Sequence, residues 1–275
     1  MDRENAPPPS RKLCHLPEEL IEEILSRLAV KSLLRFRCVS KSWRCLMSSE
    51  RFIRTQLEKS SNDPTAAHWQ VLFNCGCGSK FSTSGLQQCS VRSFLDDPDV
   101  DPSPIDDPTN HHLTTGGYLV GNCDGLLCIL KKPGSFFLWN LATRISMELP
   151  KIDLKITKSG FGHDDESGAY KVFVVGSTYA EEKREWIGKH YSSKTNSWKT
   201  VKLGCHAVGV GAEYISPNKW FRHMVWTARR VKENTGYEPA FMTRTIVNKR
   251  MKEFLQIMNN FVYVESLVSP VPQNL

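Results

Sequence analysis

The sequence has 275 residues, of which 40% are hydrophobic and 24% are charged, and its formal net charge is +7. This composition is typical of a globular protein of one or two domains and excludes a fibrous or wholly disordered chain. No apolar run approaches the roughly 20 residues that a membrane-spanning helix needs, and nine irregularly spaced cysteines fit reduced thiols better than a disulfide framework.

The first twelve residues, "MDRENAPPPSRK", are polar and rich in proline. We expect residues 1–12 to be disordered, because they have too few apolar residues to build a core. They also lack the apolar stretch of a secretory signal. The sequence therefore predicts a protein of the cytoplasm and/or the nucleus.

A block of short helices follows. Pro17 suits the first position of a helix, and the glutamates after it complement the positive end of the helix dipole. A second helix is expected from Val30 to Val39. Ser40 and Ser49 can cap two more helices. The apolar residues expected on these last two helices are Trp43, Leu46 and Met47 on the third, and Phe52, Ile53 and Leu57 on the fourth.

The first helix carries too many apolar residues for one buried side. At about 100° per residue they cover roughly 180° of its surface, whereas a helix on a single core needs a stripe of about 100°. A core of fewer than about 70 residues also rarely supplies more than roughly 3–5 kcal/mol. The pattern predicts a module that binds a partner, and the alternative is that the stripe packs against the rest of the chain. The apolar residues are Leu16, Leu20, Ile21, Ile24, Leu25 and Leu28.

The same stretch resembles the F-box of plant F-box proteins. The similarity runs from Leu16-Pro17 through "VKSLLRFRCVSKSW" at Val30–Trp43, over about forty residues, and includes both apolar and polar positions. Ala29 departs from the pattern, because this group usually has proline there. Losing that proline should loosen the turn between two helices modestly.

The resemblance implies docking onto a Skp-family adaptor and, through it, onto the cullin and RING subunits of a ubiquitin ligase. It implies that Trp43 and Phe36 belong to the core of the module itself. The residues that it implies for the adaptor contact are Leu16, Pro17, Leu20, Ile24, Leu28, Val30 and Leu33.

Nucleic-acid binding is the competing interpretation of this block. Helices two to four are basic, and a helix-turn-helix domain has a similar size. Glutamates interleave with the basic side chains, however, and no single recognition helix collects them. A solvated face or an electrostatic match to an acidic adaptor explains the pattern better. The basic residues are Lys31, Arg35, Arg37, Lys41, Arg44, Arg51 and Arg54.

The middle of the chain predicts strands. A polar link covers residues 60–68, and the acidic, proline-rich segment 96–112 lacks the glycine and glutamate of an EF-hand, so we expect a surface loop there. "YLVGNCDGLLCIL" predicts a hairpin that turns at Asp124-Gly125. Closely spaced strands without helices between them favour an antiparallel sandwich, barrel or propeller.

An internal echo favours the propeller. "WNLATRISMEL" from Trp139 and "YSSKTNSWKTV" from Tyr191 each place a threonine, Thr143 or Thr195, four residues after an aromatic residue. The offset of about fifty residues is near the length of a kelch-type repeat.

A second resemblance concerns this β region. "GNCDGLLCI", "LWNLATR", "GFGHDDESGAYKVF" and "HYSSKTNSWKTV" occur in the order seen in the F-box-associated domain of plant F-box and F-box/kelch proteins. That domain is a propeller-like β fold that recruits a substrate, and the resemblance covers residues 69–203. It breaks after Leu203 and resumes in "FVYVESLVSP", which resembles the closing strand. Either blades are missing or the remainder is divergent.

No set of residues predicts catalysis or metal binding. Cys75 and Cys77 are one residue apart, too close for the usual zinc spacing, and Cys89 follows without a second pair. Cys123 beside Asp124 is explained by the hairpin turn, and His163 lies at a polar hairpin tip without a catalytic setting. We therefore expect no cofactor, no metal and no catalytic residue.

The sequence thus predicts an α+β multidomain protein, in which a small helical F-box precedes a mainly antiparallel, propeller-like domain that is complete or lacks blades. We expect a non-catalytic subunit that recruits an unknown protein for ubiquitination. The alternative is a truncated F-box protein that binds Skp without recruiting substrate. We expect neither nucleic acid nor membrane as a partner. The predicted segments are a disordered 1–12, an F-box at 13–59, a linker at 60–68, the F-box-associated region at 69–204, and a divergent or truncated remainder at 205–275 with a closing strand near 261–268.

Overall fold

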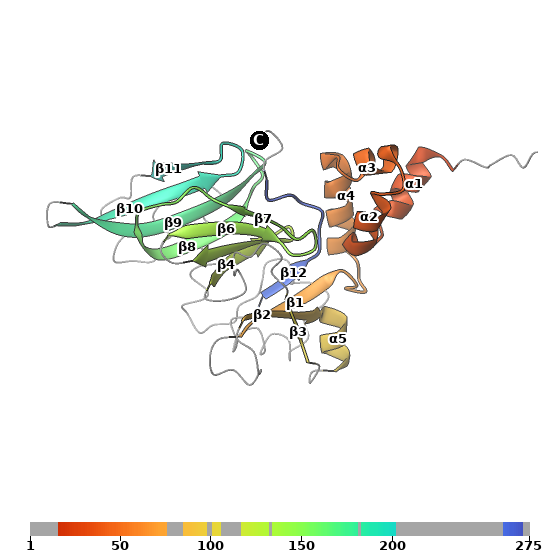
Figure 1. The fold of residues 1–275 in the computed structure, drawn as a ribbon, viewed down its shortest axis with the longest axis horizontal. Helices are drawn as coiled ribbons and strands as arrows, with labels where there is room; N and C mark the ends of the chain where they lie inside the picture. Colours follow the sequence, from red (N-terminus) through yellow and green to blue (C-terminus); the bar gives the residue numbers. More distant parts are fainter. Residues whose placement is uncertain are drawn as a thin grey trace, which may run out of the picture.

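A computed structural model shows four helices followed by three antiparallel sheets (Figure 1). The predicted class, a short helical block before a mainly antiparallel β domain, is confirmed. Across the part of the chain that the structure describes, the strands form separate four-stranded sheets and do not close into a ring. The structure describes residues 16–75, 85–97, 101–105, 117–131, 134–180, 183–201 and 261–271.

The helical block contains α1 (Glu18–Leu25), α2 (Val30–Phe36), α3 (Lys41–Leu46) and α4 (Glu50–Ser61). Both predicted serine caps are confirmed. The Ser40 hydroxyl accepts the backbone N–H of Trp43 at 3.1 Å, and the Ser49 hydroxyl accepts that of Phe52 at 3.3 Å. Helix α4 therefore starts where the sequence predicts, but it runs to Ser61, into the segment expected to be a linker.

The first sheet joins the two ends of the β region. Its strand order is β12 (Phe261–Val264), β1 (Trp69–Cys75), β2 (Gly85–Ser90) and β3 (Ser103–Pro104). The short β3 lies inside the acidic segment for which we expected only a surface loop. Helix α5 (Val91–Asp96) was not predicted; it is capped by Ser90 and packs Val91 and Phe94 against this sheet.

The other two sheets follow the chain in order. The second sheet contains β4 (Tyr118–Cys123), β5 (Leu126–Lys131), β6 (Ser135–Asn140) and β7 (Ile145–Glu148). The third contains β8 (Lys155–Asp164), β9 (Ala169–Ala180), β10 (Lys183–Ser192) and β11 (Ser197–Val201). The first strands of these two sheets, β4 and β8, are neighbours, and β12 lies beside β4. This arrangement of successive four-stranded sheets is that of propeller blades.

The predicted internal repeat is confirmed as a repeat of structure. The hairpin β6–β7 and the hairpin β10–β11 occupy the same place in the second and third sheets. Their turns end on residues with positive φ at the same offset from the aromatic residue, Arg144 after Trp139 and Asn196 after Tyr191.

The predicted hairpin at Asp124-Gly125 is also confirmed. Both residues have positive φ, 52° and 79°, as a tight two-residue turn between strands requires. A Cβ on Gly125 would lie only 2.5 Å from the Ser266 hydroxyl, so glycine is needed for space as well as for backbone angle.

The C-terminal residues 261–271, here called the closing segment, hold the sheets together. Strand β12 pairs with β1 from Trp69–Val264 to Leu72–Phe261. Beyond the strand, the buried side-chain amide of Asn140 donates to the backbone oxygens of Ser266 at 3.0 Å and Val268 at 2.8 Å. The prediction of a divergent or truncated remainder falls, for residues 205–260, outside the described residues.

The role of Asn140 can be tested directly. Asn140→Ala leaves two carbonyls of the closing segment unpaired, and it also removes the oxygen that accepts the Ala142 and Thr143 N–H groups. We expect the free energy of unfolding to fall by about 2–4 kcal/mol, measured by denaturant titration. The matched control is Asn62→Ala on the exposed end of α4, which should cost less than about 1 kcal/mol. Equal losses from the two variants would contradict this account.

Candidate functional site

Helix α1 exposes one apolar side to solvent. Leu16, just before the helix, and Leu20 and Ile24 within it are 54%, 50% and 53% exposed. Leu20 and Ile24, four residues apart within α1, lie along one side of the helix, and Leu16 is exposed just before it; we call these three residues the outer stripe. They make up half of the six large hydrophobic residues exposed in the described part of the chain. A concentration of this kind marks an interaction site more often than scattered apolar residues do.

The opposite side of α1 belongs to a buried core, which we call the helical core. Leu25 is 2% exposed and shares the core with residues from each of the other three segments of the block. Phe36 and Trp43 pack at its edge with their rings in an edge-to-face contact at 5.8 Å, as predicted for the module's own core. The buried members of the helical core are Leu25, Val30, Leu33, Met47, Phe52 and Leu267.

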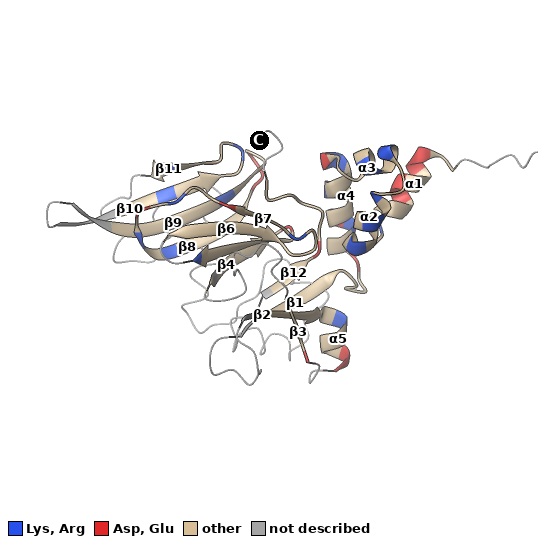
Figure 2. Cartoon of the chain, viewed as in Figure 1, with Lys and Arg blue, Asp and Glu red and all other residues tan. Residues whose placement is uncertain are grey.

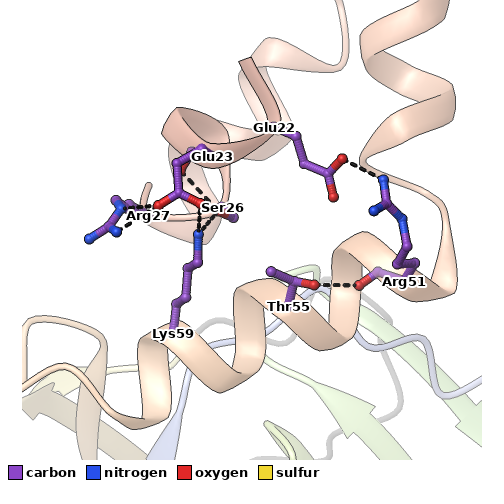
Figure 3. Close-up of polar contacts among 7 residues, drawn as sticks. All are labelled: Glu22, Glu23, Ser26, Arg27, Arg51, Thr55 and Lys59. Atoms are coloured by element: carbon purple, nitrogen blue, oxygen red, sulfur yellow. Dashed lines mark hydrogen bonds and ion pairs between the residues drawn. The ribbon is translucent and has the colours of Figure 1, made fainter. Parts of the chain in front are cut away.

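Charged side chains hold α1 against α4 (Figure 3). Arg51 on α4 donates to Glu22 on α1, and Lys59 donates to both Glu23 and the Ser26 hydroxyl. These contacts lie where α1 meets α4, and they favour the orientation of α1 in which Leu25 faces the helical core. In that orientation the other apolar side of α1 faces solvent.

Glu23 is the centre of this ionic contact. It accepts hydrogen bonds from Lys59 and, at i+4, from Arg27. The hydrogen bond from Lys59, followed by the one from Arg27, lowers the pKa of the Glu23 carboxyl below its ordinary value of 4.5. The carboxylate is exposed, so its effect on stability is screened by water and small.

The seven residues expected to bind the adaptor differ in their exposure to solvent. Leu20 and Ile24 are exposed on one side of α1, Leu16 and Pro17 are exposed just before the helix, and Leu28 is partly buried. Pro17 lies at the N-cap, one position before the helix, rather than at its first residue.

Val30 and Leu33 correct the prediction. Both are completely buried in the helical core, so neither can touch a partner without opening the module. The physical reason is that α2 is apolar along much of its length and packs its side chains into the core that it shares with the other helices. We therefore remove these two residues from the candidate contact.

Val39 is an exposed apolar residue that we did not select from the sequence. It is 61% exposed and follows α2, which ends at Phe36 instead of continuing to Val39 as predicted. The sequence does contain a signal for its exposure. Val39 directly precedes the Ser40 cap of the next helix, so it lies outside both helices.

Three of the seven basic residues considered for nucleic-acid binding make contacts within the helical block. Figure 2 shows acidic residues on α1 and basic residues on α2 and α3. Arg51 and Arg54 pair with glutamates, and Arg37 donates to the Met47 carbonyl oxygen at 3.1 Å. Burial lowers the pKa of Arg37, in keeping with its place inside the module. Several of the predicted basic side chains thus stabilise the fold instead of facing a ligand.

The cysteine and histidine candidates stay explained by the fold. Burial raises the pKa of the Cys123 thiol strongly and that of Cys89 to about 11, which opposes the thiolate form that nucleophiles and metal ligands need. His163 contacts Asp165 at a hairpin tip. Within the described ranges, no three His, Cys, Asp or Glu side chains are placed to hold a metal ion. Cys77 lies outside those ranges.

These features define a chain that combines a small helical docking module with antiparallel β sheets. Comparison with known families then identifies the module. Residues 13–55 match the F-box domain family, so the chain contains an F-box domain, as its motif predicted.

Similar proteins occur in Arabidopsis thaliana. The F-box/kelch-repeat protein At3g23880 is 32% identical over 198 residues, which are 68% of this chain and 51% of that protein. The putative F-box protein At3g52320 is 37% identical over 59% of this chain and 40% of its own length. The F-box/kelch-repeat protein At4g19930 is 28% identical over 78% of this chain and 53% of its own length.

The chain thus spans about half the length, or less, of the relatives that it matches. The described helices include none that is both long enough and apolar enough to serve as a membrane span.

Two leucine truncations test the two sides of the module. Leu33→Ala removes a completely buried side chain and should lower the free energy of unfolding by about 2–5 kcal/mol. Leu20→Ala removes a half-exposed side chain and should cost less than about 1 kcal/mol. Denaturant titration of both proteins checks the contrast. A loss at Leu20 as large as that at Leu33 would mean that the outer stripe is packed within the chain.

The contact between α1 and α4 should depend on pH. Because the pKa of Glu23 is lower in the folded protein than in the unfolded chain, its carboxylate stabilises the fold above 4.5 and loses this effect as the pH falls through the folded-state pKa. Glu23→Gln should therefore lower the thermal midpoint near neutral pH, and the gap from wild type should narrow in acid. Glu50→Gln is the control, because Glu50 pairs within α4 and does not join two helices. A gap that widens in acid would show that the sign is wrong.

Proposed function

We propose that this chain is the substrate-recognition subunit of a Skp–cullin–F-box ubiquitin ligase. The F-box binds a Skp-family adaptor, which brings the cullin and RING subunits. The β sheets recruit a protein for ubiquitination in the cytoplasm or the nucleus. The chain itself supplies no catalytic group, since its contribution is to hold a substrate close to the transfer machinery.

The observation that supports this proposal most directly is the outer stripe. An F-box domain with Leu16, Leu20 and Ile24 about half exposed presents an apolar surface that its own fold does not cover. The ion pairs from Glu22 and Glu23 to α4 hold this surface in place before any partner binds. A contact that is organised in advance loses less conformational entropy on binding.

The exposed basic side chains on α2 and α3 fit the same partner. Lys31, Arg35, Lys41 and Arg44 are exposed, whereas most of the acidic residues of the four helices lie on α1 (Figure 2). Such a divided surface favours a partner with an acidic region beside an apolar one, which speeds the encounter and fixes its orientation.

A second candidate function is a chain that binds Skp without presenting a substrate. One observation favours it: the described strands form three sheets without a closed ring. Such a chain would compete with complete F-box proteins for the adaptor. Reconstitution with Skp, cullin and RING subunits separates the two candidates. Ubiquitination of a protein cross-linked to the β sheets supports recruitment, and displacement of another F-box protein without such ubiquitination supports competition.

The adaptor contact is tested by co-purification with plant Skp proteins. Ile24→Asp places a charge in the outer stripe and should weaken capture at least about tenfold, because the charge would have to be buried in an apolar interface. Since Ile24 is 53% exposed, the thermal midpoint should stay close to that of wild type.

The control carries the same substitution far from the F-box. Ile145 on β7 is 40% exposed, so Ile145→Asp makes an equal change of charge on the second sheet. This variant should bind Skp as wild type does. If wild type is folded but binds no Skp protein, the proposed function is wrong; equal loss in both variants would show that the outer stripe is not the contact.

A further inference from the structure

The helical core contains a side chain from the other end of the protein. Leu267 is 3% exposed and belongs to the same buried cluster as Leu25, Val30 and Leu33 of the F-box. The F-box domain matched at residues 13–55 thus lacks one member of its own core. The closing segment supplies that member.

The backbone on both sides of Leu267 is held by the β sheets. Before it, the Ser266 hydroxyl donates to the Asp124 carbonyl oxygen at 2.5 Å. Around it, the amide of Asn140 donates to the backbone oxygens of Ser266 and Val268. After it, Val268 is buried in the large core between the second and third sheets. Leu267 therefore projects from a fixed backbone into the helical core.

The closing segment also joins the connection that leads out of the F-box. The backbone N–H of Glu265 donates to the His68 carbonyl oxygen, just before β1, and β12 then pairs along β1. Figure 1 shows this segment, in blue, passing between the helical block and the sheets. One short stretch thus touches the F-box core, the first sheet and the second sheet.

Helix α4 makes a separate contact with the sheets. Its Ile53 and Leu57 pack against the β cores, and they do not depend on Leu267 for their position in the chain. Helices α1 and α2 have no comparable residue in the β cores among the described contacts. Loss of Leu267 should therefore loosen α1 and α2 first, while α4 stays on the sheets.

We infer that Leu267 is a positioning residue for the adaptor contact, so that the outer stripe is held for Skp only when the closing segment is seated on the β sheets. The inference rests on the proposed function, since it concerns the same contact. Its physical basis is that Leu25, in the helical core, directly follows Ile24 of the outer stripe on α1. A cavity in the helical core weakens the packing on which the orientation of α1 depends.

The consequence is that the F-box becomes able to bind Skp at the same time as the closing segment completes the β domain. A chain whose C-terminal strand is unpaired keeps every residue of the F-box motif, yet its α1 and α2 open more often. Such a chain binds Skp less well, because only the closed fraction is competent to bind.

The test uses hydrogen exchange on the full chain with Leu267→Ala. We expect amide protection in α1 and α2 to fall by about tenfold or more, since truncating a buried leucine leaves a cavity in a small core. Protection in β5 and β6 should stay unchanged. Skp capture should fall in parallel, although Leu267 is buried and cannot touch the adaptor itself.

Two further variants complete the design. Val271→Ala truncates an aliphatic residue of the same segment that is 37% exposed, and it should behave as wild type. Leu267→Met keeps the volume of the side chain and should restore both protection and capture. Recovery with methionine would separate filling of the core from a general fault of the segment.

Unchanged protection of α1 and α2 in Leu267→Ala overturns the inference, and so does a loss of protection that extends equally through β5 and β6. The proposed function fails separately, when folded wild type captures no Skp protein. Reduced protection with undiminished Skp capture also overturns the inference, because the adaptor contact would then not depend on the helical core.

Discussion

The return of the closing segment to the start of the β region is the contact on which the rest of the structure depends. Strand β12 pairs with β1, and the polar groups that follow are paired by Asn140, the Asp124 carbonyl and the His68 carbonyl. Each of these bonds joins residues that are far apart in the sequence. Their formation carries the entropic cost of closing a very long loop, which grows only slowly with length. Once closed, the segment has buried apolar side chains on three sides, in the F-box, in the first sheet and in the second.

The closing segment adds a buried residue to the small core of the F-box. A block of four short helices has too little buried area to be very stable alone. From the sequence we expected a partner protein to supply the missing area. The structure shows that part of it comes from the same chain, through Leu267 and the partly buried Ala142. The outer stripe stays outside this contact, so the alternative in which the whole apolar surface of α1 packs within the chain is wrong.

Local features of this fold could be predicted from the sequence because their causes are local. The Ser40 and Ser49 caps and the Asp124-Gly125 turn depend on residues within a few positions of one another. The repeat of hairpins was visible because two blades face the same packing demands. Which of the residues expected to contact the adaptor are buried, and which are exposed, could not be predicted in the same way. Both Val30 and Ile24 fit an apolar pattern, and only the tertiary contacts decide that Val30 is buried and Ile24 is exposed. The segment that carries Leu267 was predicted as a closing strand, but its contact with the F-box was not, since its partners lie at the other end of the chain.

The contact between the F-box and the β sheets bears on the proposed adaptor role. Ile53 of α4 packs against both the helical core and the large β core, so the F-box and the sheets are not independent bodies on a flexible connection. A ligase subunit that holds its substrate at a fixed distance raises the effective concentration of that substrate, whereas a flexible connection spreads it over a larger volume. Two rigid contacts, α4 on the sheets and Leu267 in the F-box, restrict rotation where a single contact would leave a hinge. The exposed stripe on α1 and the β sheets are thus related by a geometry that the chain itself sets.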